Sequence, residues 1–299
     1  MKVAIAALVF TSILAAQPPT KFEVASVKPV AVRGGGTCPE SLKIDGGFVY
    51  VKCATLPMLI GYAFRISPGR VKRIEGRASR FDIAATIPPD ASPRQVPDMV
   101  QALLSDRFHL TTHLGVSREP VYALVVAKGG LRVKKAASSD VDLDPDIETT
   151  GVSFYGDIIT RGSTLLGNAR MGTVKQTDGP DRHQRWDAPN ISFAGLADLL
   201  DKVTPLTLPI LDMTGLKGRY ELVLEVSLND SIGSPAARIG AARDPASAAG
   251  ADDKRMEMEE SVLREFNVGL RKLGLQLERR RGMVETLIVD RVDSMPAGN

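Results

Sequence analysis

TLPMLIGYAF, residues 55–64, and RFDIAATI, residues 80–87, decide the fold because the same pair of patterns returns later in the chain. Thr55 stands before an apolar run and is typical of a helix N-cap, whereas the alternation after Arg80 indicates a strand. The order returns as SFAGLADLL at residues 192–200 and GRYELVLEV at residues 218–226. The sequence therefore predicts an internal repeat of a helix followed by a strand.

A third element repeats as well. MVQALLSDRFHLTTH (99–113) and VGLRKLGLQLERR (268–280) each predict a helix that runs into a strand, and a last strand follows each, VYALVVAK (121–128) and VETLIVDRV (284–292). We expect each half to be a hairpin, a helix, a strand, a helix and two strands. The predicted fold class is α+β: two similar helix-on-antiparallel-sheet units that arise from internal duplication. Equivalent core positions would be Leu59 with Leu196 and Phe81 with Tyr220.

The repeat and the composition divide the chain. We expect a first α+β unit at residues 17–132, a polar and acidic linker at 133–170, and a second unit at 171–299. An Ala-, Ser-, Gly- and Asp-rich stretch at about 229–257 predicts a disordered insertion within the second unit.

The N-terminus has the pattern of a signal peptide. Lys2 precedes an apolar run from Val3 to Leu14, and small residues follow at Ala15 and Ala16. The run is shorter than the ~20 residues of a membrane-spanning helix, and no later stretch is long enough. We expect cleavage near Ala16 and a periplasmic or secreted protein without a membrane span.

CPESLKIDGGFVYVKC, residues 38–53, holds the only two cysteines. Asp45-Gly46 between alternating apolar residues favours a two-residue hairpin turn, which would place Cys38 opposite Cys53. Two cysteines alone cannot complete a structural zinc site, and an exported chain meets oxidising conditions. The prediction is a structural disulfide, with two free buried thiols as the alternative.

The charge is nearly balanced, with a formal net charge of +3, and does not favour nucleic acid. The basic stretch at residues 65–80 could meet an anionic envelope polymer. A solvated loop is the preferred interpretation, because no aromatic side chains interleave the charges.

Candidate chemistry fails on spacing. His109 and His113 are four residues apart, but the alternation around them indicates a strand, where they would lie about 13 Å apart. His183 has no implied partner. The aspartates from Asp140 to Asp146 suggest either a weak calcium site or a solvated acidic linker, since Pro145 occupies the glycine position of an EF-hand loop. Nucleotide and serine-nucleophile motifs are absent, so we assign no catalytic residue, metal or cofactor.

The motifs FEVASVKP (22–29), ALLSDRFHLTTH (102–113), LDMTGLKGRYEL (211–222) and LIVDRVDSMPAGN (287–299) resemble a family of secreted proteins of unknown function expanded in soil Acidobacteria. Related domains of that family are attached to BlaR-type membrane metallopeptidases. Many members carry Gly-Pro-x-Trp before the RFDI strand, where this chain has EGRAS from Glu75. The order of elements also resembles the short N-terminal domain of secretins and TonB-dependent receptors. That likeness implies an interaction module that pairs a sheet edge with a partner strand.

Two functions remain open. The first is an exported, non-catalytic binding or sensor module that recognises a protein, peptide or glycan in the cell envelope, with an envelope protein or peptide as the expected partner. The alternative is a secreted hydrolase with an unrecognised active site. The oligomeric state is left open. For the first function, the candidate interaction strands contain Val121, Tyr122, Leu124, Val126, Leu287 and Val289.

Overall fold

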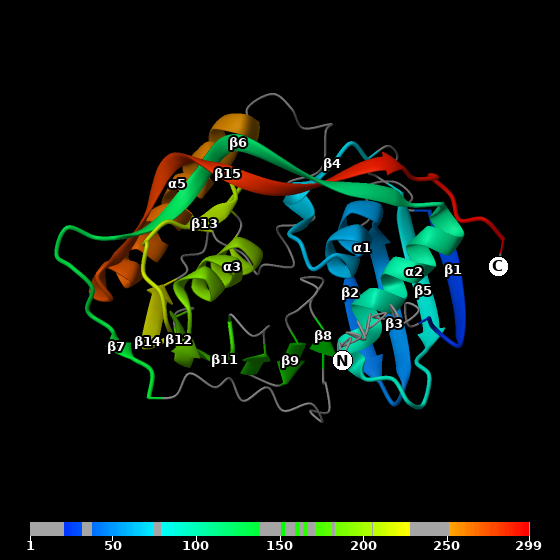
Figure 1. Ribbon diagram of the computed structural model, residues 1–299, viewed down its shortest axis with the longest axis horizontal. Coiled ribbons are helices and arrows are strands. Elements are labelled where there is room, and N and C mark those ends of the chain that lie inside the picture. The colour runs from blue at the N-terminus through cyan, green and yellow to red at the C-terminus, as the bar shows by residue number, and fades with distance from the viewer. Residues whose placement is uncertain are drawn as a thin grey trace, which may run out of the picture.

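The protein forms two lobes that lie side by side and are joined along one side by a long two-stranded ribbon (Figure 1). Its computed structural model describes residues 21–31, 38–74, 79–137, 151–152, 159–161, 164–166, 171–180, 183–204, 206–227 and 251–298. Helices combine with antiparallel and mixed sheets, which confirms the α+β class.

The first lobe has a four-stranded antiparallel layer in the order β1-β5-β3-β2, covered by helices α1 and α2. The alternation that predicted these strands turns every second side chain into the core, as in the buried Phe81 and Ile83 of the RFDI motif. The elements are β1 (Val24–Val30), β2 (Ser41–Asp45), β3 (Phe48–Thr55), α1 (Leu56–Ala63), η1 (Pro68–Arg70), β4 (Val71–Lys72), β5 (Arg80–Thr86), η2 (Pro93–Gln95) and α2 (Val96–Phe108).

The second lobe contains the layer β11-β12-β14-β7 and helices α3 and α5. Short strands between β2 and β11 join the two layers into one eleven-stranded sheet, so residues predicted as a linker contribute strands. The elements are β7 (Lys134–Lys135), β8 (Gly151–Val152), β9 (Ile159–Arg161), β10 (Thr164–Leu166), β11 (Thr173–Asp178), β12 (His183–Ile191), α3 (Phe193–Val203), β13 (Ile210–Asp212), β14 (Tyr220–Ser227) and α5 (Ala251–Lys272). Helix α5 therefore begins inside the predicted insertion.

The predicted N-cap Thr55 is confirmed and its counterpart Ser192 is also an N-cap, but the two side chains act differently. Ser192 caps α3, and its side chain accepts a hydrogen bond from the Gly195 backbone N–H at 3.0 Å. Thr55 caps α1 without such a bond. The second residue of that helix, Pro57, has no N–H, which leaves the Met58 N–H as the only usual capping donor, and Thr55 does not bind it.

The register predicted for the first hairpin is wrong. Asp45 pairs with Phe48, so the turn residues are Gly46 and Gly47 rather than Asp45 and Gly46. Their φ angles are +54° and +82°. A type I′ turn needs positive φ at both central residues, and two glycines adopt it more easily than Asp followed by Gly.

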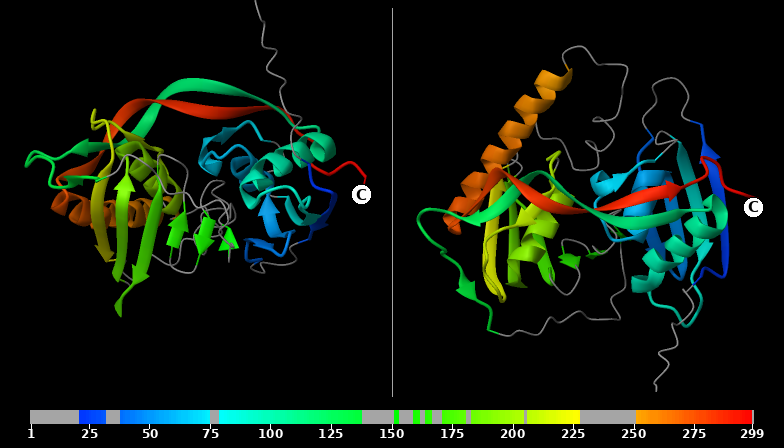
Figure 2. Two further views of the ribbon diagram at one scale, coloured as in Figure 1. Left: turned by 60° about the horizontal axis from the view of Figure 1, so that its bottom comes forward. Right: turned by 45° about the horizontal axis from the view of Figure 1, so that its top comes forward.

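The largest departure from prediction is the ribbon. The two final strands expected in each half are one continuous strand, β6 (Thr111–Val126) in the first half and β15 (Leu275–Arg291) in the second. These strands pair antiparallel along nearly their whole length. Each therefore leaves its own half and ends in the other lobe (Figure 2).

Each hydrophobic core therefore contains residues from the half of the chain that forms the other lobe. Leu287 and Val289 of β15 belong to the first cluster, whereas Tyr122 and Leu124 of β6 belong to the second. The two cores thus do not coincide with the predicted units at residues 17–132 and 171–299.

Candidate functional site

At the residues predicted to interact with a partner, β6 and β15 already pair with other strands of the same chain. Val121, Tyr122, Leu124, Leu287 and Val289 are all buried, and Val126 is half-buried. The parallel strand β13 covers Tyr122 to Leu124 on the side opposite β15. Strand β4 covers Leu287 and Ile288 in the same way. These segments are central rather than edge strands.

A free edge remains on β6, before the segment that β13 covers. From Thr111 to Glu119, β6 has β15 as its only neighbour among the described strands. In this part the ribbon arches between the lobes, with β6 along the outer side of the arch in the left view of Figure 2.

The hydrogen bonds at the covered end show which backbone groups face outward. The Tyr122 N–H donates to the Pro209 carbonyl at 2.9 Å, and the Leu124 carbonyl accepts from the Met213 N–H at 2.9 Å. Tyr122 and Leu124 therefore point away from β15. The register has no break between residues 112 and 126, so the even-numbered residues all point the same way.

By this alternation, the outward N–H and carbonyl groups of the free edge belong to Thr112, Leu114, Val116 and Arg118. Pro120 follows at the next outward position, where its missing N–H costs the ribbon no hydrogen bond.

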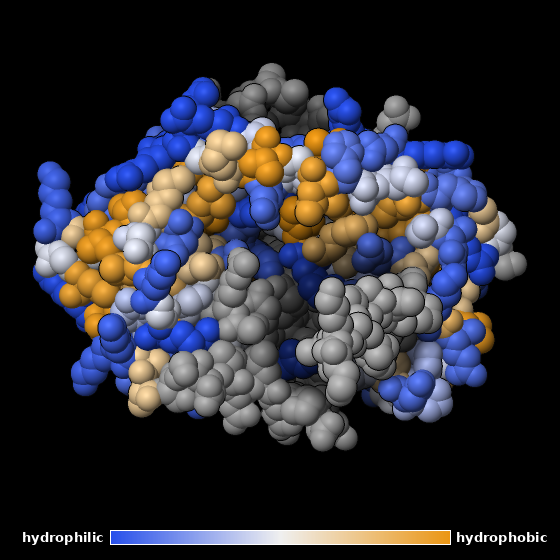
Figure 3. Space-filling view, viewed as in Figure 1, coloured by the Kyte–Doolittle hydropathy of each residue, from blue (hydrophilic) through white to orange (hydrophobic). Residues whose placement is uncertain are grey.

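Apolar side chains are exposed along this arch. Leu114 is 70% exposed, Val116 60% and Met283 61%. Leu114 and Val116 alternate along β6, and Met283 of β15 stands opposite Arg118 on the same face. Figure 3 shows hydrophobic surface over the middle of the ribbon, where the two lobes meet.

Two glycines mark close approaches of the ribbon, Gly282 to Leu211 and Met213 and Gly115 to the neighbouring strand β15. A Cβ at Gly282 would lie 2.6 Å from the Met213 side chain and 2.8 Å from that of Leu211. A Cβ at Gly115 would lie 2.5 Å from Ile288. On β15, Gly282, Val284 and Thr286 are buried whereas Met283 and Glu285 between them are exposed, so one face of the ribbon packs against the protein and the other is open.

A family model described as a protein of unknown function, DUF3738, matches residues 57–292. The chain belongs to the DUF3738 family. The matched region runs from α1 to the end of β15, so it includes both strands of the ribbon. No curated protein and no solved structure gives a significant match. In the described part of the chain, no helix is both long and apolar enough to cross a membrane.

The histidines of this DUF3738 protein lie apart in separate pairs. His109 ends α2 with φ +48°, so its predicted place in a strand is wrong, and its Nδ1 lies 2.7 Å from Asp293 Oδ2. His113 Nδ1 lies 2.9 Å from both carboxylate oxygens of Asp290. His183 contacts Ser227 Oγ at 2.9 Å. The described residues contain no group of three or more His, Cys, Asp or Glu side chains that could hold a metal ion.

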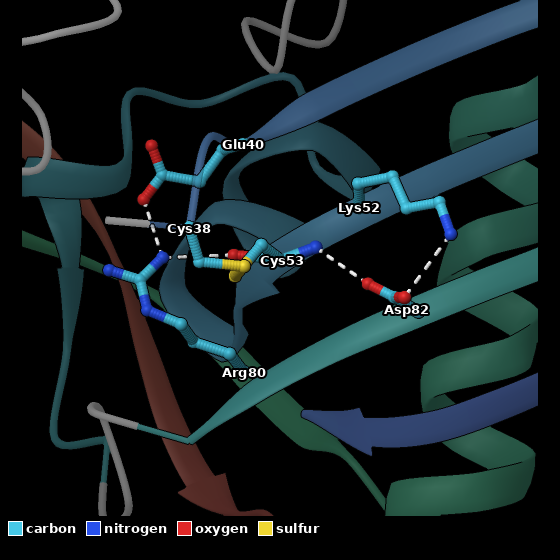
Figure 4. The surroundings of a disulfide bond; sticks show 6 residues. All are labelled: Cys38, Glu40, Lys52, Cys53, Arg80 and Asp82. Carbon is cyan, nitrogen blue, oxygen red and sulfur yellow. Dashed lines mark hydrogen bonds and ion pairs between the residues drawn. A yellow bond between two sulfur atoms is a disulfide. The ribbon is translucent and has the colours of Figure 1, made fainter. Parts of the chain in front are cut away.

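The disulfide between Cys38 and Cys53 is present, with Cα atoms 6.0 Å apart (Figure 4). It does not use the predicted register. A bulge in β3 between Val51 and Ala54, together with a φ of +53° at Cys53, turns Cys53 out of the regular ladder. The Cys53 N–H donates to Asp82 Oδ1 at 2.8 Å, and this bond holds the bulge in place.

Basic side chains of the stretch at residues 65–80 form salt bridges with carboxylates of the same chain. Arg65 pairs with Asp98 at 2.7 Å, and Arg70 pairs with the largely buried Asp201 at 3.3 Å. Burial raises the pKa of the Asp201 carboxyl, and the Arg70 guanidinium opposes that shift. Because Asp201 lies on α3, the Arg70 pair fastens one lobe to the other.

One buried cluster combines a carboxylate, two hydroxyls and a guanidinium, which are residue types found in active sites. Glu259 of α5 accepts hydrogen bonds from the Tyr122 hydroxyl at 2.6 Å and the Thr207 hydroxyl at 2.7 Å. Arg279 Nε donates to the Tyr122 hydroxyl oxygen at 3.2 Å. Burial and the bond to Glu259 raise the pKa of Tyr122 to about 12. Each carboxylate oxygen already has a donor from the same chain, so the cluster fixes α5 to the ribbon.

The free edge could hardly be predicted from the sequence. Thr112 and Leu114 were predicted to lie in a strand, and the residues from there to Pro120 have no catalytic or ligand-binding motif. The signals in this stretch are the apolar Leu114 and Val116 on either side of Gly115 and the proline at position 120. The aspartates from Asp140 to Asp146 and the predicted signal peptide lie outside the described residues.

Proposed function

We propose that this DUF3738 protein is an exported recognition module that binds a protein or peptide of the cell envelope at the free edge of β6. The observation that carries the proposal is the row of outward backbone groups from Thr112 to Arg118 beside the exposed Leu114 and Val116. Unpaired strand edges are templates for another strand, and native proteins usually cover or blunt them.

The mode of binding is strand addition. An extended segment of the partner pairs with the outward N–H and carbonyl groups of β6, and its alternate side chains lie beside Leu114 and Val116. The backbone bonds contribute affinity, and the apolar face selects the segment. Because the inner face packs against the protein, the edge is ordered before the partner arrives, which lowers the entropy cost of binding.

Export is part of the proposal. The charged, apolar and small residues of the first sixteen positions have the order of a signal peptide, and a disulfide persists in an oxidising compartment. A periplasmic or secreted location would also suit the resemblance to secreted Acidobacteria proteins and to domains fused to BlaR-type metallopeptidases.

Internal duplication would explain how the two lobes came to share a ribbon. Leu59 and Leu196 are both buried, and Phe81 and Tyr220 each pack on an aromatic ring, Phe108 and Phe193 respectively. In an experimentally determined structure, α1 and β5 should superpose on α3 and β14 with these residues matched. Different topologies in the two lobes would end the duplication hypothesis.

The test of recognition is site-specific photo-crosslinking in the native cell envelope. A photoreactive amino acid replaces Val116 in one protein and Lys43 in another; Lys43 is exposed but lies on β2, which has neighbours on both sides. We expect a defined adduct from position 116 and none from position 43. The adduct should disappear when Leu114→Pro removes an outward N–H. Equal adducts at both positions, or none at 116, would refute the proposal.

A further inference from the structure

The free edge of β6 is symmetric about its own centre. Its outward groups belong to Thr112, Leu114, Val116 and Arg118, and Gly115 lies at the midpoint. Pro120 ends the row on one side because it has no N–H, and β6 begins at Thr111 on the other. An edge of this kind can pair with a second copy of itself along its whole length.

Antiparallel pairing around a two-fold axis at Gly115 sets a definite register. Leu114 lies opposite Val116 of the second copy, and Thr112 lies opposite Arg118 of the second copy. In this register every outward N–H from Thr112 to Arg118 meets an outward carbonyl, because all four residues have the same orientation. The interface is isologous and closes on itself, as expected for a two-fold dimer.

The side chains fit the same register. The two Leu–Val pairs bring together four side chains that are 60–70% exposed in the single chain. Arg118 meets a threonine, so no two like charges are directly opposed. On the other face, His113 meets Ser117 and Glu119 meets Thr111, and again no like charges are opposed.

We propose that, in the absence of its envelope partner, this protein pairs with a second copy through the free edges of β6. The inference rests on the proposed function, since it assigns a resting state to the same site: the dimer covers the edge, and an incoming strand must displace the second copy. Covering an edge in this way also prevents open-ended aggregation.

The first experiment is sedimentation velocity on the purified protein across a range of concentrations. We expect a reversible monomer–dimer equilibrium. Val116→Pro, which removes an outward N–H, should raise the dimer dissociation constant by at least about tenfold. Val116→Ile keeps both the N–H and the apolar side chain and should leave that constant unchanged. Circular dichroism of each variant checks that the fold is kept.

A cysteine pair tests the register without relying on loss of binding. In the double variant Leu114→Cys with Val116→Cys, each new thiol faces its counterpart across the dimer axis, at a Cα separation of about 5.5 Å that a disulfide can span. Mild oxidation should give a covalent dimer that is held by two intermolecular bonds. Leu114→Cys alone places the two new thiols on a diagonal and should crosslink far less.

Several results would overturn the inference. A wild-type protein that stays monomeric at every concentration would do so, as would a dimer that Val116→Pro leaves unchanged. These failures differ from failure of the proposed function. A monomer that still forms an adduct with an envelope protein at position 116 would remove only the dimer, whereas a dimer whose only adduct at position 116 is with a second copy of this chain would remove only the envelope partner.

Discussion

Strands cross from one lobe to the other. Replacing Leu124 or Leu287 by a smaller residue should therefore weaken the lobe that is built mainly from the other half of the chain. Leu124 lies in the first half of the chain but is fully buried in the second core. Leu287 lies in the second half but is 2% exposed within the first core. Replacing either by alanine removes buried apolar groups and leaves a cavity, which costs about 2–5 kcal/mol.

The assay is hydrogen exchange of the native protein followed by mass spectrometry. Leu124→Ala should accelerate exchange first in α3 and β14, and Leu287→Ala should do so first in α1 and β5, because local opening follows the weakened core. Leu114→Ala is the matched control: the residue is on the same strand as Leu124 but is 70% exposed. It should change the unfolding free energy by less than about 0.5 kcal/mol. If Leu124→Ala loosened α1 instead, the strand exchange would be wrong.

Three further predictions concern stability. Replacing both Cys38 and Cys53 by serine should lower the unfolding free energy by about 3 kcal/mol, since the bond closes a loop with a sequence separation of 15, and reduction of the native protein should add about two daltons to its mass; no change in either measurement would argue for free thiols. Tyr122 has a folded pKa of about 12 against about 10 when unfolded, so its contribution is complete below pH 10 and is lost as the pH rises through 12. The stability difference between wild type and Tyr122→Phe in urea should therefore shrink over this window by up to about 3 kcal/mol, and a constant difference would contradict the buried hydroxyl. Arg70→Met should destabilise by about 3 kcal/mol because it leaves the Asp201 charge buried, and adding Asp201→Asn should restore more than half of the loss; equal losses in the single and double variants would count against the pair.

Local patterns predicted the local structure well. The helices after Thr55 and Ser192 and the strands with alternating apolar residues all form, because periodicity and capping act within a few residues. The disulfide was predicted from the same hairpin, although two adjacent glycines moved the turn and a bulge at Cys53 restored the approach of the sulfurs.

Long-range pairing could not be predicted in this way. The residues around Gly115 and Gly282 do not predict that β6 and β15 continue through them as a ribbon. The continuation depends on pairing with a strand more than 160 residues away. The candidate interaction residues on β6 and β15 lie in the parts of these strands that β13 and β4 cover, and their role in binding stays a prediction. Which part of the ribbon stays uncovered depends on where β4 and β13 pair with it, and the sequence does not indicate these positions.

The most direct test of recognition at β6 is amide exchange at the edge itself. The partner obtained from the adduct at position 116 is purified and added to the free protein, and exchange is measured for the amides of residues 112–118. We expect the outward amides of Thr112, Leu114, Val116 and Arg118 to slow markedly in the complex while amides on the exposed face of α5 stay unchanged. Protection that appears elsewhere, with these four amides exchanging as before, would contradict the account.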